Sequence, residues 1–103
     1  MIVSFSTKEV ADLCSSRAAL DLRYGVARAA LIRQRLFEIA GAPSGERLTS
    51  LPCLECAPQT VNGRKWVVVR VDQQMAIVFE EIVDGTSGVH EAVIVEIQVV
   101  VDT

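Results

Sequence analysis

The stretch from Arg64 to Ile82 constrains the fold of this chain more than any other part of the sequence. Valine and isoleucine recur on both sides of one short polar break at residues 72–74. This pattern favours two β-strands over a helix, because β-branched side chains suit a pleated sheet. The polar break is short enough for a hairpin loop. An isolated hairpin is only marginally stable in water, so the rest of the chain is expected to supply further strands and a covering helix.

Elements of both kinds are predicted around this hairpin. A capping pattern from Ser6 to Glu9 begins a short helix that ends near residues 15–16. Asn62 and Gly63 form a strong turn signal directly before the hairpin. Strands are predicted at residues 1–5, 51–57, 64–71, 75–82 and 91–101, and helices at residues 7–15 and 18–40. The order strand, helix, helix and four strands predicts an α+β domain in which a helical hairpin packs on an antiparallel sheet.

The long helix is expected to end at Gly41, which would act as a left-handed cap. Its apolar face is predicted to contain Leu22, Val26, Ala29, Ala30, Leu36, Phe37 and Ala40. The opposite face carries Arg23, Arg28 and Arg35. This basic face either contacts RNA or an acidic partner segment, or is an ordinary solvated helix face.

Length and composition are those of a single domain over residues 1–103. Half of the residues are apolar, which excludes a disordered chain. Neither a signal peptide nor a membrane span is recognisable, because the apolar runs are far shorter than the ~20 residues that a span requires. A cytoplasmic protein without a membrane contact is therefore expected.

The charge is distributed unevenly along the chain, whose net charge is −3. Residues 1–47 contain seven Lys and Arg against five Asp and Glu, and residues 48–103 contain three against eight. A dedicated nucleic-acid-binding protein usually has a broad basic field. RNA binding by this chain would therefore depend on a local basic patch.

Several residues around the hairpin resemble a known family. Leu51-Pro52 precedes the sheet, residues 63–71 read GRKWVVVRV, and Ile77-Val78-Phe79 follows the turn. With the short first strand, the helical hairpin and the antiparallel meander, they resemble the RelE/ParE superfamily of bacterial toxins. The closest pattern is that of the HigB "plasmid maintenance killer" branch, whose members show a Trp-x-x-x-Arg-Val strand before a short polar turn.

The resemblance implies the toxin of a bacterial toxin–antitoxin system. Such toxins cleave mRNA on the ribosome and are held inactive by a cognate antitoxin protein. The reaction needs no metal or cofactor, because the ribose 2′-hydroxyl attacks the adjacent phosphate while side chains move protons and stabilise charge. The catalytic candidates are the hairpin cations Arg70, Lys65 and Arg64. The RNA-binding candidates are Trp66, Arg28 and Arg35.

Three family positions carry other residues in this chain. The Arg that follows the turn corresponds to Ala76, and the His or Lys of the preceding segment falls near Cys56 or Gln59. The C-terminal His or Tyr has no counterpart in residues 99–103. Removing one charge-stabilising donor typically lowers a rate about 100- to 1000-fold. The alternative is a RelE/ParE-fold module without nuclease activity that binds a partner protein. In that case a partner, or a second copy in a homodimer, would add a strand to the edge of the long last strand.

Trp66 and Arg70 are four residues apart on one strand, so both are expected on the same face of the sheet. Together they would form a phosphate-binding patch with an aromatic ring for stacking. The competing interpretation is that Trp66 belongs to the core and Arg70 pairs with Glu80 across the hairpin.

The cysteines and the single histidine permit two further interpretations. Cys53 and Cys56 are three apart, and with Cys14 and His90 they could form a zinc site. Reduced, partly buried thiols are favoured instead, because an extended chain separates residues at this spacing. His90 could act as a general base, but a solvated loop histidine is the favoured interpretation because no partner residue is evident.

Overall fold

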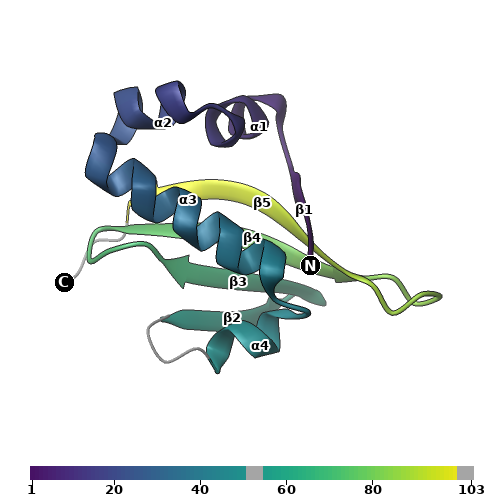
Figure 1. Ribbon diagram of the computed structural model, residues 1–103. Helices are drawn as coiled ribbons and strands as arrows, with labels where there is room; N and C mark the ends of the chain where they lie inside the picture. The colour runs from purple at the N-terminus through teal and green to yellow at the C-terminus, as the bar shows by residue number, and fades with distance from the viewer. Residues whose placement is uncertain (51–54, 100–103) are drawn as a thin grey trace.

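The computed structural model describes residues 1–50 and 55–99 (Figure 1). This part of the chain forms one five-stranded mixed sheet and four helices, so the predicted α+β class is confirmed. The helices are α1 (Lys8–Ser15), α2 (Arg17–Tyr24), α3 (Val26–Gly41) and α4 (Gly45–Thr49). The strands are β1 (Ile2–Phe5), β2 (Cys56–Val61), β3 (Arg64–Arg70), β4 (Met75–Val83) and β5 (His90–Val99).

The strand order is β1-β5-β4-β3-β2. Four consecutive strands form the predicted antiparallel meander, but β1 pairs with β5 in parallel, so the prediction of a wholly antiparallel sheet is wrong. β1 and β2 lie at opposite edges of the sheet, and the helices connect them. On the way, α3 lies over one face of the sheet (Figure 1). The meander then returns towards β1, and the last strand arrives beside β1 in the same direction.

The central hairpin has the predicted arrangement. Val67 lies opposite Phe79, and Trp66 lies opposite Glu80. Val67, Val69, Ile77 and Phe79 are fully buried under the helices. The turn before this hairpin is also confirmed, because Asn62 and Gly63 have φ values of 53° and 75° and connect β2 to β3.

The long helix predicted for residues 18–40 is in fact two helices. Gly25 separates them with a φ of 85°, a conformation that glycine adopts readily. The predicted apolar face is also wrong in part. Leu22 is 90% exposed and Phe37 is 80% exposed, while the α3 residues in the core are Ala29, Ile32 and Ile39.

Helix ends differ by small shifts from the predictions. Thr7 rather than Ser6 caps α1, accepting a hydrogen bond from the Val10 N–H at 3.2 Å. Gly41 is the last residue of α3 and not a left-handed cap. The predicted loop after it contains α4, which buries Leu48. The strand expected at residues 51–57 begins later, at Cys56, and its first four predicted residues lie outside the described ranges.

The homodimer prediction required the last strand to be an open edge of the sheet. In the structure, β1 pairs with part of that edge. Its residues Glu91 to Ile94 pair with β1 on one side, and the whole strand pairs with β4 on the other. An irregularity in the β4–β5 register leaves Val95 without an opposite residue. Strand addition along the full length of β5 is therefore excluded, because β1 occupies that edge from Glu91 to Ile94.

Candidate functional site

A buried carboxylate on the helix-covered face contacts Lys65, His90 and the backbone N–H of Gly45. The side chain of Glu81 in β4 is fully buried. Its Oε2 lies 2.5 Å from Nδ1 of His90 and accepts a hydrogen bond from the Gly45 N–H at 3.1 Å. Its Oε1 lies 3.1 Å from Nζ of Lys65. We call Glu81, Lys65, His90 and Gly45 the Glu81 cluster.

The electrostatics of the Glu81 cluster favour an ionised carboxylate. Burial alone raises the pKa of Glu81, but the hydrogen bonds from Gly45 and His90 and the ammonium of Lys65 outweigh burial and lower it below 4.5. Lys65 and Glu81 form an ion pair through Nζ and Oε1. Among the described residues, Oε1 accepts no hydrogen bond.

Gly45 begins α4 and lies directly against the carboxylate. A Cβ at this position would come within 2.5 Å of Glu81 Oε1 and 3.4 Å of a Val67 methyl group. Any larger residue at this position would therefore require the Glu81 carboxylate or α4 to move. The contact fastens α4 to the sheet, with Leu48 of the same helix buried in the core.

Acid is expected to weaken the fold partly through this cluster. The pKa of Glu81 is lower in the folded protein than its ordinary value of 4.5. The ionised carboxylate therefore stabilises the fold fully at pH values above 4.5, and this stabilisation is lost as the pH falls through the pKa of the folded state. Asp72 and Asp84 have lowered pKa values and act in the same range. We therefore expect the unfolding free-energy difference between wild type and Glu81→Gln to shrink below pH 4.5, as urea titrations would measure. A difference that stays constant into strong acid would contradict this assignment.

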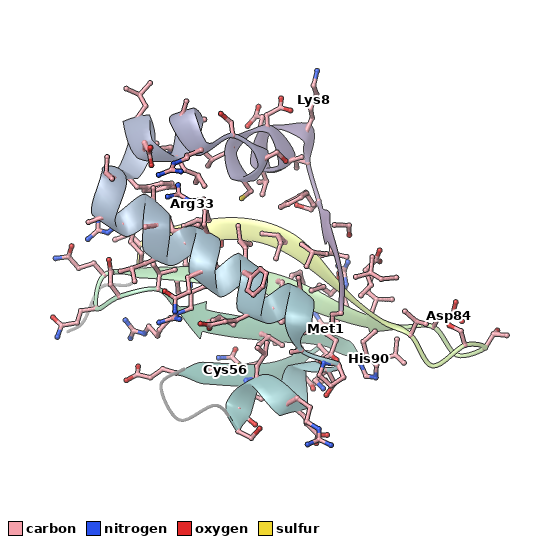
Figure 2. All side chains as sticks on the ribbon, viewed as in Figure 1. Met1, Lys8, Arg33, Cys56, Asp84 and His90 are labelled. Carbon is pink, nitrogen blue, oxygen red and sulfur yellow. The ribbon has the colours of Figure 1, made fainter. Side chains whose placement is uncertain are left out.

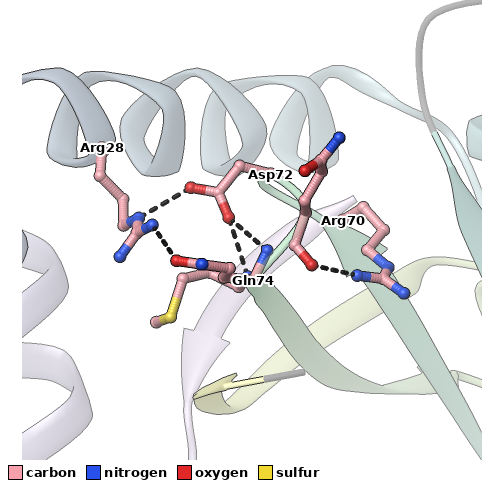
Figure 3. A network of polar contacts seen from close by, with 6 residues as sticks. Arg28, Arg70, Asp72 and Gln74 are labelled. Carbon is pink, nitrogen blue, oxygen red and sulfur yellow. Dashed lines mark hydrogen bonds and ion pairs between the residues drawn. The ribbon is translucent and has the colours of Figure 1, made fainter. Parts of the chain in front are cut away.

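A second polar network joins α3 to the turn between β3 and β4 (Figure 3). Arg28 donates to Asp72 Oδ2 at 2.7 Å and to Gln74 Oε1 at 3.0 Å. Asp72 Oδ1 accepts from the backbone N–H groups of Gln74 and Met75 at 2.8 and 2.9 Å. Burial is the largest single influence on the pKa of Asp72 and raises it, but these hydrogen bonds and the charge of Arg28 together lower it overall. Arg28 therefore braces the turn against the helix.

Arg35 and Arg70 meet at the end of β3. Arg35 donates from Nε to the Arg70 carbonyl oxygen at 3.1 Å, and its other nitrogen pairs with Glu38 at 2.9 Å. The Arg70 guanidinium donates to the Gln73 carbonyl at 3.0 Å and lies 4.0 Å from Glu55. Arg28 and Arg35 thus face the sheet, and the predicted solvated basic helix face is wrong for both.

Arg64 and Trp66 lie on the face of the sheet opposite to the helices. Arg64 binds Glu80 through two hydrogen bonds of 2.8 and 3.1 Å, and its guanidinium lies 5.4 Å from the centre of the Trp66 ring. Trp66 is half-buried. It therefore lies outside the helix-covered core, and its ring is not fully exposed for stacking. Glu80 therefore pairs with Arg64, and not with Arg70 as one interpretation expected.

The three catalytic candidates do not converge on one point. Lys65 points towards the helices and pairs with buried Glu81, while its neighbour Arg64 points to the opposite face. Arg70 shares the open face with Trp66, as predicted, and lines a shallow hollow of about 470 Å³ with Glu55, Cys56, Ala57 and Val68. Sequence reasoning missed Glu81, although its position two residues after Phe79 already placed it in the buried phase of β4.

The cysteines within the described ranges are reduced. Burial raises the pKa of Cys14 to about 11, and burial together with the charge of Glu81 raises the pKa of Cys56. Both therefore remain thiols at neutral pH. Within residues 1–50 and 55–99, no three His, Cys, Asp or Glu side chains are grouped as metal ligands. Cys53, the remaining member of the considered zinc set, lies outside these ranges.

Figure 2 shows His90 at the base of the β4–β5 connection, with Asp84 further out on the loop that projects from the molecule. Asp84 organises this loop by accepting from the N–H groups of Thr86 and Ser87 at 2.8 and 3.3 Å. None of the helices in the described residues is long and apolar enough to span a membrane. Comparisons with protein-family models, curated proteins and solved structures each gave no match.

Proposed function

We propose that this chain is a RelE/ParE-like component of a bacterial toxin–antitoxin pair that acts by binding a partner protein, without cleaving mRNA. The resemblance of the hairpin residues to HigB supports the family. The order of a short strand, helices and an antiparallel meander is compatible with it. The residues of the proposed nuclease site argue against catalysis.

The observation that carries the proposal is the separation of the hairpin cations. Lys65 and Arg64 lie on opposite faces of the sheet, and each is held by a carboxylate that is at most 13% exposed. A phosphate would have to displace Glu80 or Glu81 and leave that carboxylate without its partner. For the fully buried Glu81, such a rearrangement costs several kcal/mol. The electrostatic preorganisation that phosphate cleavage requires is therefore lacking at this pair.

Partner binding is supported by apolar side chains that the helices leave in solvent. Leu22 and Phe37 are among the most exposed large apolar residues of the described chain. Large exposed apolar side chains are typical anchors of protein interfaces. The partner expected from the family resemblance is the antitoxin, encoded by an adjacent reading frame.

Inducing the chain in bacteria tests the absence of nuclease activity. We expect growth equal to that of the empty vector, and no new mRNA 5′ ends by primer extension in a translating extract. Co-expression with the product of the adjacent reading frame should yield a stable complex, and Phe37→Asp should weaken it. Cleavage of mRNA, or the absence of any complex with that product, would overturn the proposal.

A second candidate is the mRNA endonuclease itself, which one observation favours. Arg70 lines the open hollow beside β2 and shares its face with Trp66. If the chain cleaves mRNA, Arg70→Ala should lower the cleavage rate about 100-fold or more. A matched change of a cation remote from the hollow, Arg23→Ala, should leave that rate unchanged.

A further inference from the structure

Two segments that are far apart in the sequence share one oxygen atom of Glu81. Its Oε2 accepts a hydrogen bond from the Gly45 N–H at 3.1 Å and lies 2.5 Å from Nδ1 of His90. Gly45 begins α4, and His90 follows the loop of residues 84–89 that connects β4 to β5. An ionised carboxylate only accepts hydrogen bonds, so Nδ1 of His90 carries a hydrogen. A single buried acceptor therefore holds both the start of α4 and the base of the β4–β5 loop.

Both segments have little buried surface of their own. In α4 only Gly45 and Leu48 are buried, and the other three residues are exposed. All residues from 82 to 89 are exposed, and the hydrogen bonds of the loop run between residues of the loop itself. Segments with few buried apolar contacts open locally at a low cost in free energy. α4 and the β4–β5 loop are therefore expected to open more readily than the sheet beside them.

The charge of Glu81 links these two openings. The side chain of Glu81 is fully buried, and a Cβ at Gly45 would come within 2.5 Å of its Oε1, so α4 lies directly against the carboxylate. Removing one partner of a buried charge is costly, because the charge is left with less compensation. If the loop draws His90 away, this cost lasts as long as α4 stays in place. Opening of α4 admits water to the carboxylate and removes the cost.

We propose that Glu81 couples the β4–β5 loop to α4, so that each segment stabilises the closed position of the other. A partner that binds the loop and draws His90 away would release α4, and a contact that holds α4 in place would fix the loop. The coupling acts equally in both directions, as any equilibrium coupling between two sites must. It is independent of the function proposed above, because neither segment contains Leu22, Phe37 or Arg70.

Lys65 keeps part of the compensation in place when either segment opens. Its Nζ lies 3.1 Å from Oε1, and it belongs to β3 of the central hairpin. The coupling therefore depends on the charge of the carboxylate and on how many of its partners remain. Glu81→Gln keeps the side-chain volume and an acceptor for the Gly45 N–H but removes the charge. This change should abolish the coupling while α4 stays on the sheet.

Amide hydrogen exchange followed by NMR tests the proposal. His90→Ala should accelerate exchange of the Gly45 amide about tenfold or more, and exchange of the Phe79 amide in the centre of the sheet by a smaller factor. In the Glu81→Gln background, the same His90→Ala change should leave exchange at Gly45 unchanged, because no buried charge remains. Arg64→Ala removes a cation from the opposite face of the sheet and is the matched control, with no change expected at Gly45.

Gly45→Ala supplies the measurement in the reverse direction. Its methyl group would displace the carboxylate or α4, which weakens the hold on the base of the loop. The Asp84 N–H donates to the Val89 carbonyl at 2.9 Å and closes the loop. Exchange of the Asp84 amide should therefore accelerate by a factor similar to that at Gly45 in His90→Ala, about tenfold or more.

Three results would each overturn the proposal. The first is equal acceleration of the Gly45 and Phe79 amides by His90→Ala, which would mean that the chain opens only as a whole. The second is an effect of His90→Ala on Gly45 that persists in the Glu81→Gln background. The third is an Asp84 amide that does not respond to Gly45→Ala, which can be measured even if His90→Ala fails to fold.

Discussion

Glu81→Ala is expected to lower the free energy of unfolding by about 2–4 kcal/mol. The change leaves the Gly45 N–H without its acceptor, and it removes the countercharge of Lys65 and the hydrogen-bond partner of His90. The side chains of Lys65 and His90 are 39% and 28% exposed, so water can solvate them in part, and the loss should stay below that of a fully buried ion pair. Urea unfolding followed by circular dichroism measures the change.

The neighbouring carboxylate supplies a matched control. Glu80 lies on the open face and pairs with Arg64, which is 62% exposed. Glu80→Ala is therefore expected to change stability by about 0–1 kcal/mol. Glu81→Gln keeps the side-chain volume and should fall between the two. A loss for Glu81→Ala of no more than about 1 kcal/mol, the range expected for Glu80→Ala, would show that the Glu81 cluster does not stabilise the fold.

Gly45→Ala is expected to destabilise the protein by about 1–3 kcal/mol. The new methyl group would lie 2.5 Å from Glu81 Oε1, and that carboxylate is held by Lys65 and His90. Either the carboxylate gives up these contacts or α4 moves away from the sheet. Thermal or urea unfolding gives the magnitude, and the loss should appear together with exposure of the α4 region to hydrogen exchange.

Gly41→Ala is the control for the general effect of replacing a helical glycine by alanine. Gly41 is also helical, has no atom within 4 Å of a built Cβ and has no positive φ. We expect it to leave stability unchanged or to raise it by up to about 1 kcal/mol. The double variant Gly45→Ala/Glu81→Ala should lose less than the sum of the single changes, because removing the carboxylate makes room for the methyl group. Strict additivity would contradict the proposed contact.

The Glu81 cluster also shows the limit of reasoning from residue types alone. Lys65 was identified as a catalytic candidate because it is one of three cations beside Trp66, and His90 was interpreted as a solvated loop residue. The structure connects both to one buried carboxylate. The signal available in the sequence was the position of Glu81 in phase with Ile77 and Phe79. A charge at a core position of a strand requires partners, but it does not identify them.

Local patterns in the sequence were sufficient to predict the strand pair around Trp66 and the Asn62-Gly63 turn, because neighbouring residues alone determine these features. Only the tertiary structure decided that β1 lies parallel to β5, that Phe37 faces solvent, and that Lys65 and Arg64 lie on opposite faces of the sheet. The physical reason is that a period of two or 3.6 residues sorts side chains into faces. Which face is covered, and by which distant segment, depends on contacts between residues far apart in the chain.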